Sequence, residues 1–339
     1  MQAPSSNADD ARLGALREWL AAQFPGEALT LEPASADASF RRYFRVRLRG
    51  GTRIAMDAPP QREDTGPFIR VAALMREAGL HVPAVIAADT AQGFLLLSDL
   101  GRATYLDAIN ETSADALFGD AIGALILWQR ASRPGVLPPY DRALLQRELD
   151  LFPEWYVGRH LGVTLSGAQR ALLSRIEGLL IDSALAQPRV YVHRDYMPRN
   201  LMLCEPNPGV LDFQDAVCGP ITYDIASLLR DAFISWPEPR VIDWVARYWE
   251  HAKAAGLPVA ADFGEFYRAF EWMGLQRHLK VLGIFARIRY RDGKPAYLED
   301  APRFLRYARE VAVRYAALSP LLQLLDELEQ RGPQVGYTF

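Results

Sequence analysis

The sequence predicts an α+β fold in which a small β-rich N-terminal part precedes a larger, mostly helical part. Apolar and polar residues alternate over residues 43–57, which is typical of strands. Beyond residue 101 the apolar residues recur at helical spacing, apart from a short strand-like return between Val190 and Phe213. The 339 residues are enough for two cores. We therefore expect an N-lobe over residues 1–98 and a C-lobe over residues 99–339.

The N-terminal elements follow from a change of period. Leucines at helical spacing predict a helix over residues 12–23, which Phe24-Pro25-Gly26 would end. Apolar residues then alternate with Arg45, Arg47 and Arg49, and the Gly50-Gly51 pair precedes a second alternating run, which indicates a β-hairpin. These arginines could bind phosphate, but the period of two favours a solvated strand face. A further helix over residues 67–78 and strands over residues 82–88 and 93–98 complete this part.

The C-terminal part reads as a series of helices. They are expected over residues 114–131, 141–161, 166–184, 223–233, 240–255, 263–289 and 301–330.

Composition narrows the possible partners and the compartment. The formal net charge is −3 and no block of like charge dominates, which argues against nucleic-acid binding. Apolar runs are too short for a bilayer, and the first residues lack the features of a signal peptide. Cys204 and Cys218 match no metal-binding spacing and are expected to be reduced thiols. We expect a cytoplasmic protein without a nucleic-acid, membrane or evident protein partner.

Two short stretches carry the chemistry, YVHRDYMPRNLM from Tyr191 to Met202 and VLDFQD from Val210 to Asp215. An aspartate in a rigid loop can orient a hydroxyl and accept its proton. An asparagine oxygen and a second carboxylate supply hard ligands for Mg²⁺. The spacing H-x-D-x-x-x-x-N followed by D-F-x is that of the catalytic and metal loops of kinases. The pattern predicts a two-lobed, protein-kinase-like fold that uses ATP and Mg²⁺. Its residues are His193, Asp195, Asn200 and Asp212.

The stretch HRDYMPRN…VLDFQDAVCGPITYDIASLLRD resembles the aminoglycoside phosphotransferase and choline kinase superfamily. The resemblance covers about residues 30 to 310. It implies that Asp195 is the catalytic base, that Asn200 and Asp212 bind the metal, and that Asp224 braces the catalytic loop. His193 is expected to tie this loop to the core. Asp215 could contact substrate, but we favour a surface position.

Further stretches resemble one bacterial branch of this superfamily. They are SADASFRRYFR, MDAPP, GFLLLSDLGRATYLD, ELDLFPEWYV and GLQRHLKVLGIFARIRYRDGKPAYLEDAPR. The resemblance implies phosphorylation of the anomeric hydroxyl of N-acetylmuramate or N-acetylglucosamine during peptidoglycan recycling. Two alternatives stay open. One is an aminoglycoside- or choline-type phosphotransferase, and the other is a non-catalytic nucleotide-binding scaffold.

The nucleotide contacts are expected in two loops. Residues 35–40 stand where kinases cover the phosphates, although a simple polar turn would have the same composition. Residues 95–101 resemble the hinge whose backbone pairs with adenine. The candidates are Ser39, Phe40, Arg41, Ser98, Asp99 and Leu100. The usual third-strand lysine is missing, because no lysine precedes Lys253. Arg41 or Arg42 could replace it.

The acceptor is expected to be a small amino sugar in a pocket of the helical part. Carboxylates beside an aromatic ring could bind its hydroxyls and ring face, and Arg277, Lys280 and Arg287 share one helix face. Such cations would suit the lactyl carboxylate of N-acetylmuramate. A packed helix end and a solvated basic face remain the plainer interpretations. The substrate candidates are Glu148, Glu154, Trp155 and Arg277.

Overall fold

The structure, a computed structural model, describes residues 6–35 and 40–331. Its contacts divide the chain into two compact units. The first unit contains Met1–Thr104 and Leu201–Asp215, and the second contains Tyr105–Asn200 and Ala216–Phe339. From the sequence, every residue from 99 onward is expected in the second lobe. The roles that it assigned to the two lobes stay a prediction.

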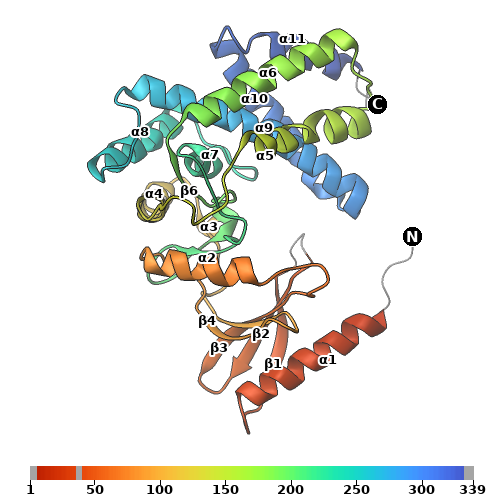
Figure 1. The fold of residues 1–339 in the computed structure, drawn as a ribbon, viewed down its shortest axis with the longest axis vertical. Coiled ribbons are helices and arrows are strands. Elements are labelled where there is room, and N and C mark those ends of the chain that lie inside the picture. The colour runs from red at the N-terminus through yellow and green to blue at the C-terminus, as the bar shows by residue number, and fades with distance from the viewer. Residues whose placement is uncertain (1–5, 36–39, 332–339) are drawn as a thin grey trace. The chain divides into compact units, whose positions relative to one another are not determined.

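The first unit is built on one antiparallel sheet with the strand order β1-β2-β3-β5-β4 (Figure 1). Strands β2 and β3 form the predicted hairpin, with Arg42 opposite Asp57 and Leu48 opposite Gly51. The strands are β1 (Thr30–Ser35), β2 (Arg42–Leu48), β3 (Gly51–Asp57), β4 (Val85–Asp89) and β5 (Phe94–Ser98).

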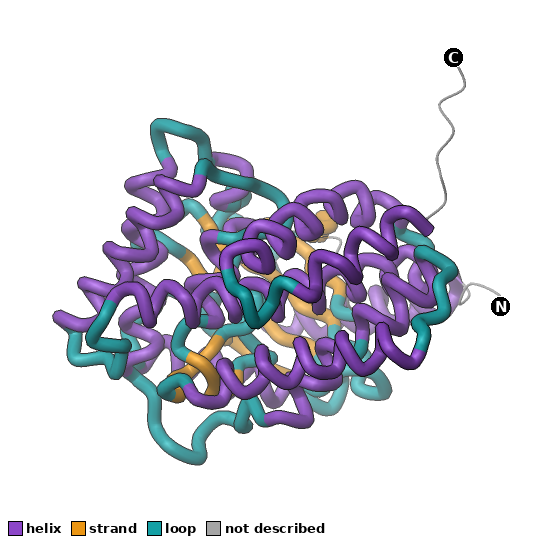
Figure 2. Tube along the Cα trace, turned by 90° about the horizontal axis from the view of Figure 1, so that it is seen from above, coloured by secondary structure: helices purple, strands orange, loops and turns teal. Residues whose placement is uncertain are grey.

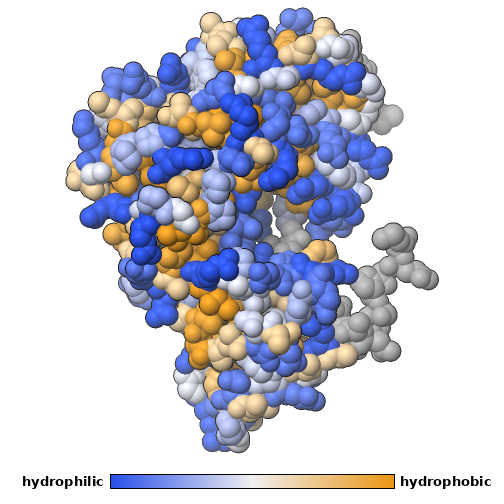
Figure 3. Space-filling model, in the orientation of Figure 1, coloured by the Kyte–Doolittle hydropathy of each residue, from blue (hydrophilic) through white to orange (hydrophobic). Residues whose placement is uncertain are grey.

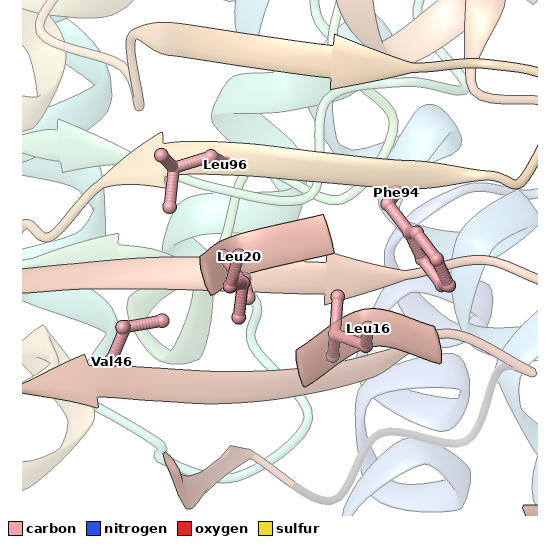
Figure 4. Close-up of a cluster of buried hydrophobic side chains, with 6 residues drawn as sticks. Leu16, Leu20, Val46, Phe94 and Leu96 are labelled. Atoms are coloured by element: carbon pink, nitrogen blue, oxygen red, sulfur yellow. The ribbon is translucent and has the colours of Figure 1, made fainter. Parts of the chain in front are cut away.

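Helix α1 (Ser6–Gln23) covers one face of this sheet. Leu16 and Leu20 are fully buried against side chains of β2, β3 and β5, as the close-up in Figure 4 shows. Burial of each leucine contributes about 2 kcal/mol. Helix α2 (Gly66–Glu77) ends close to its predicted stop, since Gly79 adopts a positive φ of 88°.

Arg45 corrects the expectation of a solvated arginine face. The residue is 7% exposed, and its Nε lies 2.6 Å from Oδ2 of Asp99. Its Nη2 donates to the carbonyl of Gly101. Alternation along the strand could not reveal a carboxylate 54 residues away that makes burial of this charge possible. Arg47 does follow the expectation and pairs with Glu32 in solvent.

The segment Leu201–Asp215 belongs to the first unit through backbone contacts. Strand β7 (Leu201–Met202) pairs with β8 (Gly209–Val210), and isolated bridges join Gly209 to His81 and Met202 to Thr104. A Cβ at Gly209 would lie 2.8 Å from the sulfur of Cys204 and 2.9 Å from Leu100. A larger residue at this position would therefore require the side chains of Cys204 and Leu100 to shift.

Helices dominate the second unit. The tube view in Figure 2 draws the helices of the chain in purple. On the face drawn in Figure 3, hydrophilic and apolar side chains are interspersed over them. No helix of the described residues is long and apolar enough to span a membrane. The α-helices are α3 (Tyr105–Ala108), α4 (Ala114–Arg130), α5 (Arg142–Leu149), α6 (Gly167–Ala186), α7 (Tyr223–Leu229), α8 (Glu238–Ala254), α9 (Phe263–Asp292), α10 (Ala301–Arg314) and α11 (Pro320–Arg331). The other elements are η1 (Phe152–His160), β6 (Arg189–Val192), η2 (Pro198–Asn200), β9 (Val217–Pro220) and η3 (Pro295–Asp300).

Two predicted helices are interrupted. The helix expected over residues 141–161 is α5 followed by the π-helix η1, where Pro153 cannot donate an α-helical hydrogen bond. The helix expected over residues 301–330 is divided into α10 and α11. Pro320 begins α11 and disfavours a helical conformation at Ser319, so the chain turns there.

Candidate active site

The loop that carries Asp195 lies between β6 and η2 of the second unit. Strand β6 pairs with β9, which anchors the start of the loop. Asp224, in the first turn of α7, accepts hydrogen bonds from the backbone N–H groups of His193 at 2.7 Å and Arg194 at 3.0 Å. One buried carboxylate therefore fixes two consecutive peptide groups just before Asp195.

The environment of Asp224 decides its charge. Burial raises the pKa of Asp224 to about 6, although His193 and the two backbone hydrogen bonds act in the opposite direction. Above pH 6 the carboxylate is ionised and both bonds are charge-assisted.

His193 and Arg194 shape the loop in different ways. His193 is fully buried, and its Nδ1 accepts the backbone N–H of Asp195 at 3.2 Å. Arg194 has a φ of +79°, and in the described part of the chain only Asp212 shares a positive φ among non-glycine residues. Such conformations cost about 1–3 kcal/mol and gather at functional sites. Both strained residues thus fall in the two predicted motifs.

Asn200 completes this loop. Its side-chain nitrogen donates to the backbone carbonyl of Asp195 at 2.9 Å, and its backbone N–H donates to Met197 at 2.8 Å. The carboxylate of Asp195 is half-buried and forms no hydrogen bond or ion pair with any residue that the structure describes. A positioned carboxylate of this kind can accept a proton from a ligand hydroxyl.

A buried charge network supports the same loop from the other side. Oε1 of Glu148 accepts from Arg194 at 2.6 Å and from Lys280 at 2.8 Å. Its Oε2 accepts from the hydroxyl of Tyr140 and, at 3.3 Å, from Gln276. Glu148 on α5 thereby joins the catalytic loop to α9.

The network keeps its groups charged. Burial alone would raise the pKa of Glu148, but Lys280 and Arg194 lower it to about 2. Burial alone would lower the pKa of Lys280, yet Glu148 and Tyr223 raise it overall, and the charge of Asp195 adds to this effect. Lys280 also donates to the hydroxyl of Tyr223 at 2.9 Å. Lys280 therefore stays positively charged, and its charge interacts with that of Asp195.

The second motif lies in the first unit. Asp212 has a φ of +61°, and its Oδ1 accepts from the side chain of Gln214 at 2.9 Å. Phe213 is fully buried and packs on Phe68 of α2, with ring centroids 4.8 Å apart. This aromatic contact anchors Phe213, the residue that follows Asp212 in the chain.

The chain was compared with protein-family models and with known proteins. Residues 30–263 match the model of the phosphotransferase enzyme family.

The chain belongs to this family.

An N-acetylmuramate/N-acetylglucosamine kinase of Pseudomonas aeruginosa is 56% identical over 334 residues, which cover 95% of this chain and 98% of the relative. Solved structures share the fold at low identity. A putative aminoglycoside phosphotransferase from Ralstonia eutropha has a TM-score of 0.62 at 16% identity, covering 88% of this chain and 96% of its own. The ADP-bound aminoglycoside phosphotransferase APH(2'')-Ib has a TM-score of 0.57 at 16% identity, with coverages of 88% and 98%. The resemblance stated from the sequence and the kinase-like α+β fold are thereby confirmed.

The second unit of this phosphotransferase contains a pocket of about 470 Å³ beside the catalytic loop. Four cations and three carboxylates line it together with two apolar side chains. They are Arg147, Arg194, Lys280, Arg287, Glu148, Asp150, Glu154, Leu151 and Ile284. Its volume lies in the usual range for small-molecule sites.

The predicted substrate residues take different positions around this pocket. Glu148 and Glu154 line it, whereas Trp155 is half-buried in η1 and is not part of its wall. Arg277 is 5% exposed, and its guanidinium lies 5.1 Å from the centre of the Tyr223 ring, outside the pocket lining. Their roles stay predictions. Lys280 and Arg287, from the same predicted helix face as Arg277, do line the pocket.

The predicted nucleotide residues all lie in the first unit. Ser39 falls outside the described residues, and Phe40 is exposed under the guanidinium of Arg62. Ser98 joins β5 to Ala84 through both its hydroxyl and its backbone N–H. The backbone groups of Asp99 and Leu100 form no hydrogen bond within the described residues. Their pairing with a base stays a prediction.

Arg41 and Arg42 differ in their surroundings. Arg42 donates to Asp57, at the end of β3, with its Nε at 3.0 Å. Arg41 is a half-buried residue 3.7 Å from Glu63. Burial alone would lower the pKa of Arg41, but Tyr43, Glu63, Asp212 and Asp215 raise it overall. The negative charges of Asp212 and Asp215, in the predicted metal motif, therefore act on Arg41.

The sequence patterns indicated no functional role for Arg194 or Tyr140. Both matter because of Glu148, which lies 46 residues before Arg194. The sequence did contain a signal. Glu148 lies on the same face of α5 as Leu145 and Leu149, and a carboxylate buried there needs charged or hydrogen-bonding partners.

Proposed function

We propose that this phosphotransferase transfers the γ-phosphoryl group of ATP to the anomeric hydroxyl of N-acetylmuramate or N-acetylglucosamine, which yields the sugar 1-phosphate. The observation that carries the proposal is the 56% identity to a kinase of that name over 95% of the chain. The pocket supports it, because a cationic acceptor such as an aminoglycoside or choline would require a strongly acidic lining, and cations here outnumber carboxylates.

In the proposed reaction Asp195 orients the acceptor hydroxyl and takes its proton. The hydroxyl oxygen bonds to the γ-phosphorus while the bond from that phosphorus to the β-phosphate oxygen breaks, and ADP leaves. Asp224 and Asn200 hold the loop, because they bond to its backbone before and at Asp195. An anomeric hydroxyl is more acidic than an ordinary alcohol, so a carboxylate is a sufficient base.

Asn200 and Asp212 are the proposed Mg²⁺ ligands. Their donor set fits the ion, since an amide oxygen and a carboxylate are hard oxygen ligands. The nitrogen of the Asn200 amide is bound to the Asp195 carbonyl, which directs the amide oxygen elsewhere. Bound magnesium would neutralise charge on the phosphates. Arg41 is the proposed substitute for the absent lysine.

The test is an acceptor panel followed by ADP release. N-acetylmuramate, N-acetylglucosamine, an aminoglycoside and choline are compared, and phosphorus NMR locates the new ester. Turnover is expected only with the amino sugars, at the anomeric oxygen. Asp195→Asn is expected to lose about a hundredfold or more in kcat without loss of stability. Wild-type turnover in this variant would contradict the role of Asp195.

A further inference from the structure

Arg287 is a cation in the pocket wall that the fold itself does not use. Arg194 and Lys280, in the same wall, are both bonded to Glu148. Arg287 forms no hydrogen bond or ion pair with any residue in the described ranges. Its Nε is shut off from solvent and still lacks an acceptor. A donor left in this state costs free energy that a bound anion would recover.

The charges around Arg287 also favour binding of an anion. Burial and the charge of Arg291 lower the pKa of Arg287, and the smaller opposing effects of Asp292 and Glu154 do not offset them. The charged form is therefore short of negative partners within the protein. An anionic group on a ligand would supply one through a charge-assisted bond.

Arg287 is placed to reach a substituent rather than the reacting hydroxyl. Lys280, Ile284 and Arg287 occupy one face of α9 and line one pocket. Seven residues correspond to about 10 Å along the helix. Lys280 and Arg194, the residue before Asp195, both donate to Oε1 of Glu148, so the Lys280 end is nearer the proposed base. A monosaccharide with its hydroxyl at that end would direct a substituent toward Arg287.

We propose that Arg287 binds the lactyl carboxylate of N-acetylmuramate and so sets the preference between this acidic sugar and neutral N-acetylglucosamine. The inference rests on the proposed function. It makes Arg287 a determinant of specificity rather than of catalysis, because N-acetylglucosamine has no carboxylate to offer.

The experiment compares steady-state kinetics of Arg287→Gln, Arg287→Lys and wild type with both sugars. For Arg287→Gln, kcat/KM with N-acetylmuramate is expected to fall about 10- to 100-fold, mainly through KM. With N-acetylglucosamine it should change less than about threefold. Arg287→Lys should recover part of the loss, since it keeps the charge but not the guanidinium fork. Arg289→Gln, an exposed neighbour on α9, is the matched control and should alter neither sugar.

Turnover of N-acetylglucosamine also reports that each variant is folded. Equal losses with both sugars, or no loss with either, would overturn the role of Arg287 while leaving the proposed function standing. Wild-type protein that phosphorylates neither sugar would overturn the proposed function and this inference together.

Discussion

Two buried carboxylates, Asp57 in the first unit and Glu148 in the second, are each held by two cationic side chains. Asp57 is fully buried and binds Arg12 and Arg42, whose Nε atoms both lie 3.0 Å away. Glu148 is 5% exposed and binds Arg194 and Lys280. In charge and burial the two clusters are close to equivalent.

Their attachments differ. The cations around Asp57 come from α1 and β2, so the cluster fastens a helix and two strands within one sheet. The cations around Glu148 come from the catalytic loop and α9, and all three residues line the pocket. Similar electrostatics therefore fasten a sheet in one unit and hold the loop of Asp195 beside a pocket in the other. The attached elements, rather than the charges, decide the role.

The largest expected effect belongs to Glu148→Gln. It leaves two cations without their carboxylate, and breaking a buried pair costs about 3–5 kcal/mol. Because Arg194 would lose its anchor beside Asp195, kcat should also fall about 10- to 100-fold. Urea unfolding and ADP release at low temperature measure both quantities. Glu154→Gln, on the exposed rim of the pocket, is the control for stability. Full activity in folded Glu148→Gln would remove the distinction between the clusters.

The stabilisation by the Glu148 cluster should decrease within a defined pH range. The pKa of Glu148 is about 2 in the folded protein and near 4.5 ordinarily, so its stabilisation is complete above pH 4.5 and is lost as the pH falls toward 2. The stability difference between wild type and Glu148→Gln should shrink by about 3 kcal/mol across that range. Asp224, whose pKa is raised, changes stability in the opposite direction but is common to both proteins. A constant difference over this range would contradict the assignment.

Asp57→Asn should separate stability from activity. It removes the charge that holds Arg12 and Arg42, both of which keep some exposure, so we expect a loss of about 2–3 kcal/mol. The folded variant should retain kcat within about threefold, since the cluster fastens the sheet. Urea titration and kinetics below the transition test this. Asp243→Asn, which breaks an exposed pair on α8, should cost less than about 0.5 kcal/mol.

The smallest expected effects are those of replacing two glycines on α9 by alanine. A Cβ at Gly283 would lie 2.3 Å from the carbonyl carbon and oxygen of Leu151, a pocket residue, so Gly283→Ala should cost about 2 kcal/mol and raise KM. A Cβ at Gly274 would lie 3.7 Å from His278, an ordinary contact. Gly274→Ala should therefore be neutral or stabilising by up to about 1 kcal/mol. Thermal unfolding and kinetics of the two variants decide whether α9 must approach η1 this closely.

Local patterns in the sequence predicted what depends on near neighbours. Alternation predicted the β2–β3 hairpin, and the spacing from His193 to Asn200 predicted the loop that Asp224 holds. The prediction that Arg45 is solvated was wrong, because its partner Asp99 lies 54 residues away in the chain. The Glu148 cluster was missed for the same reason, since Lys280 lies 132 residues away. Pro320 was a local signal for the break between α10 and α11. The prediction of one continuous helix followed the helical periodicity on both sides of it instead.

The segment Leu201–Asp215 gives the fold an order of assembly during synthesis. The chain leaves the first unit after Thr104 and returns to it only at Leu201, where β7 and β8 complete the contacts with His81 and Thr104. A nascent polypeptide that has reached only residue 104 thus lacks part of its own unit. The ribosome must add about another hundred residues, most of them in the second unit, before the first can close. A gene truncated after codon 104 would for this reason encode an incomplete product.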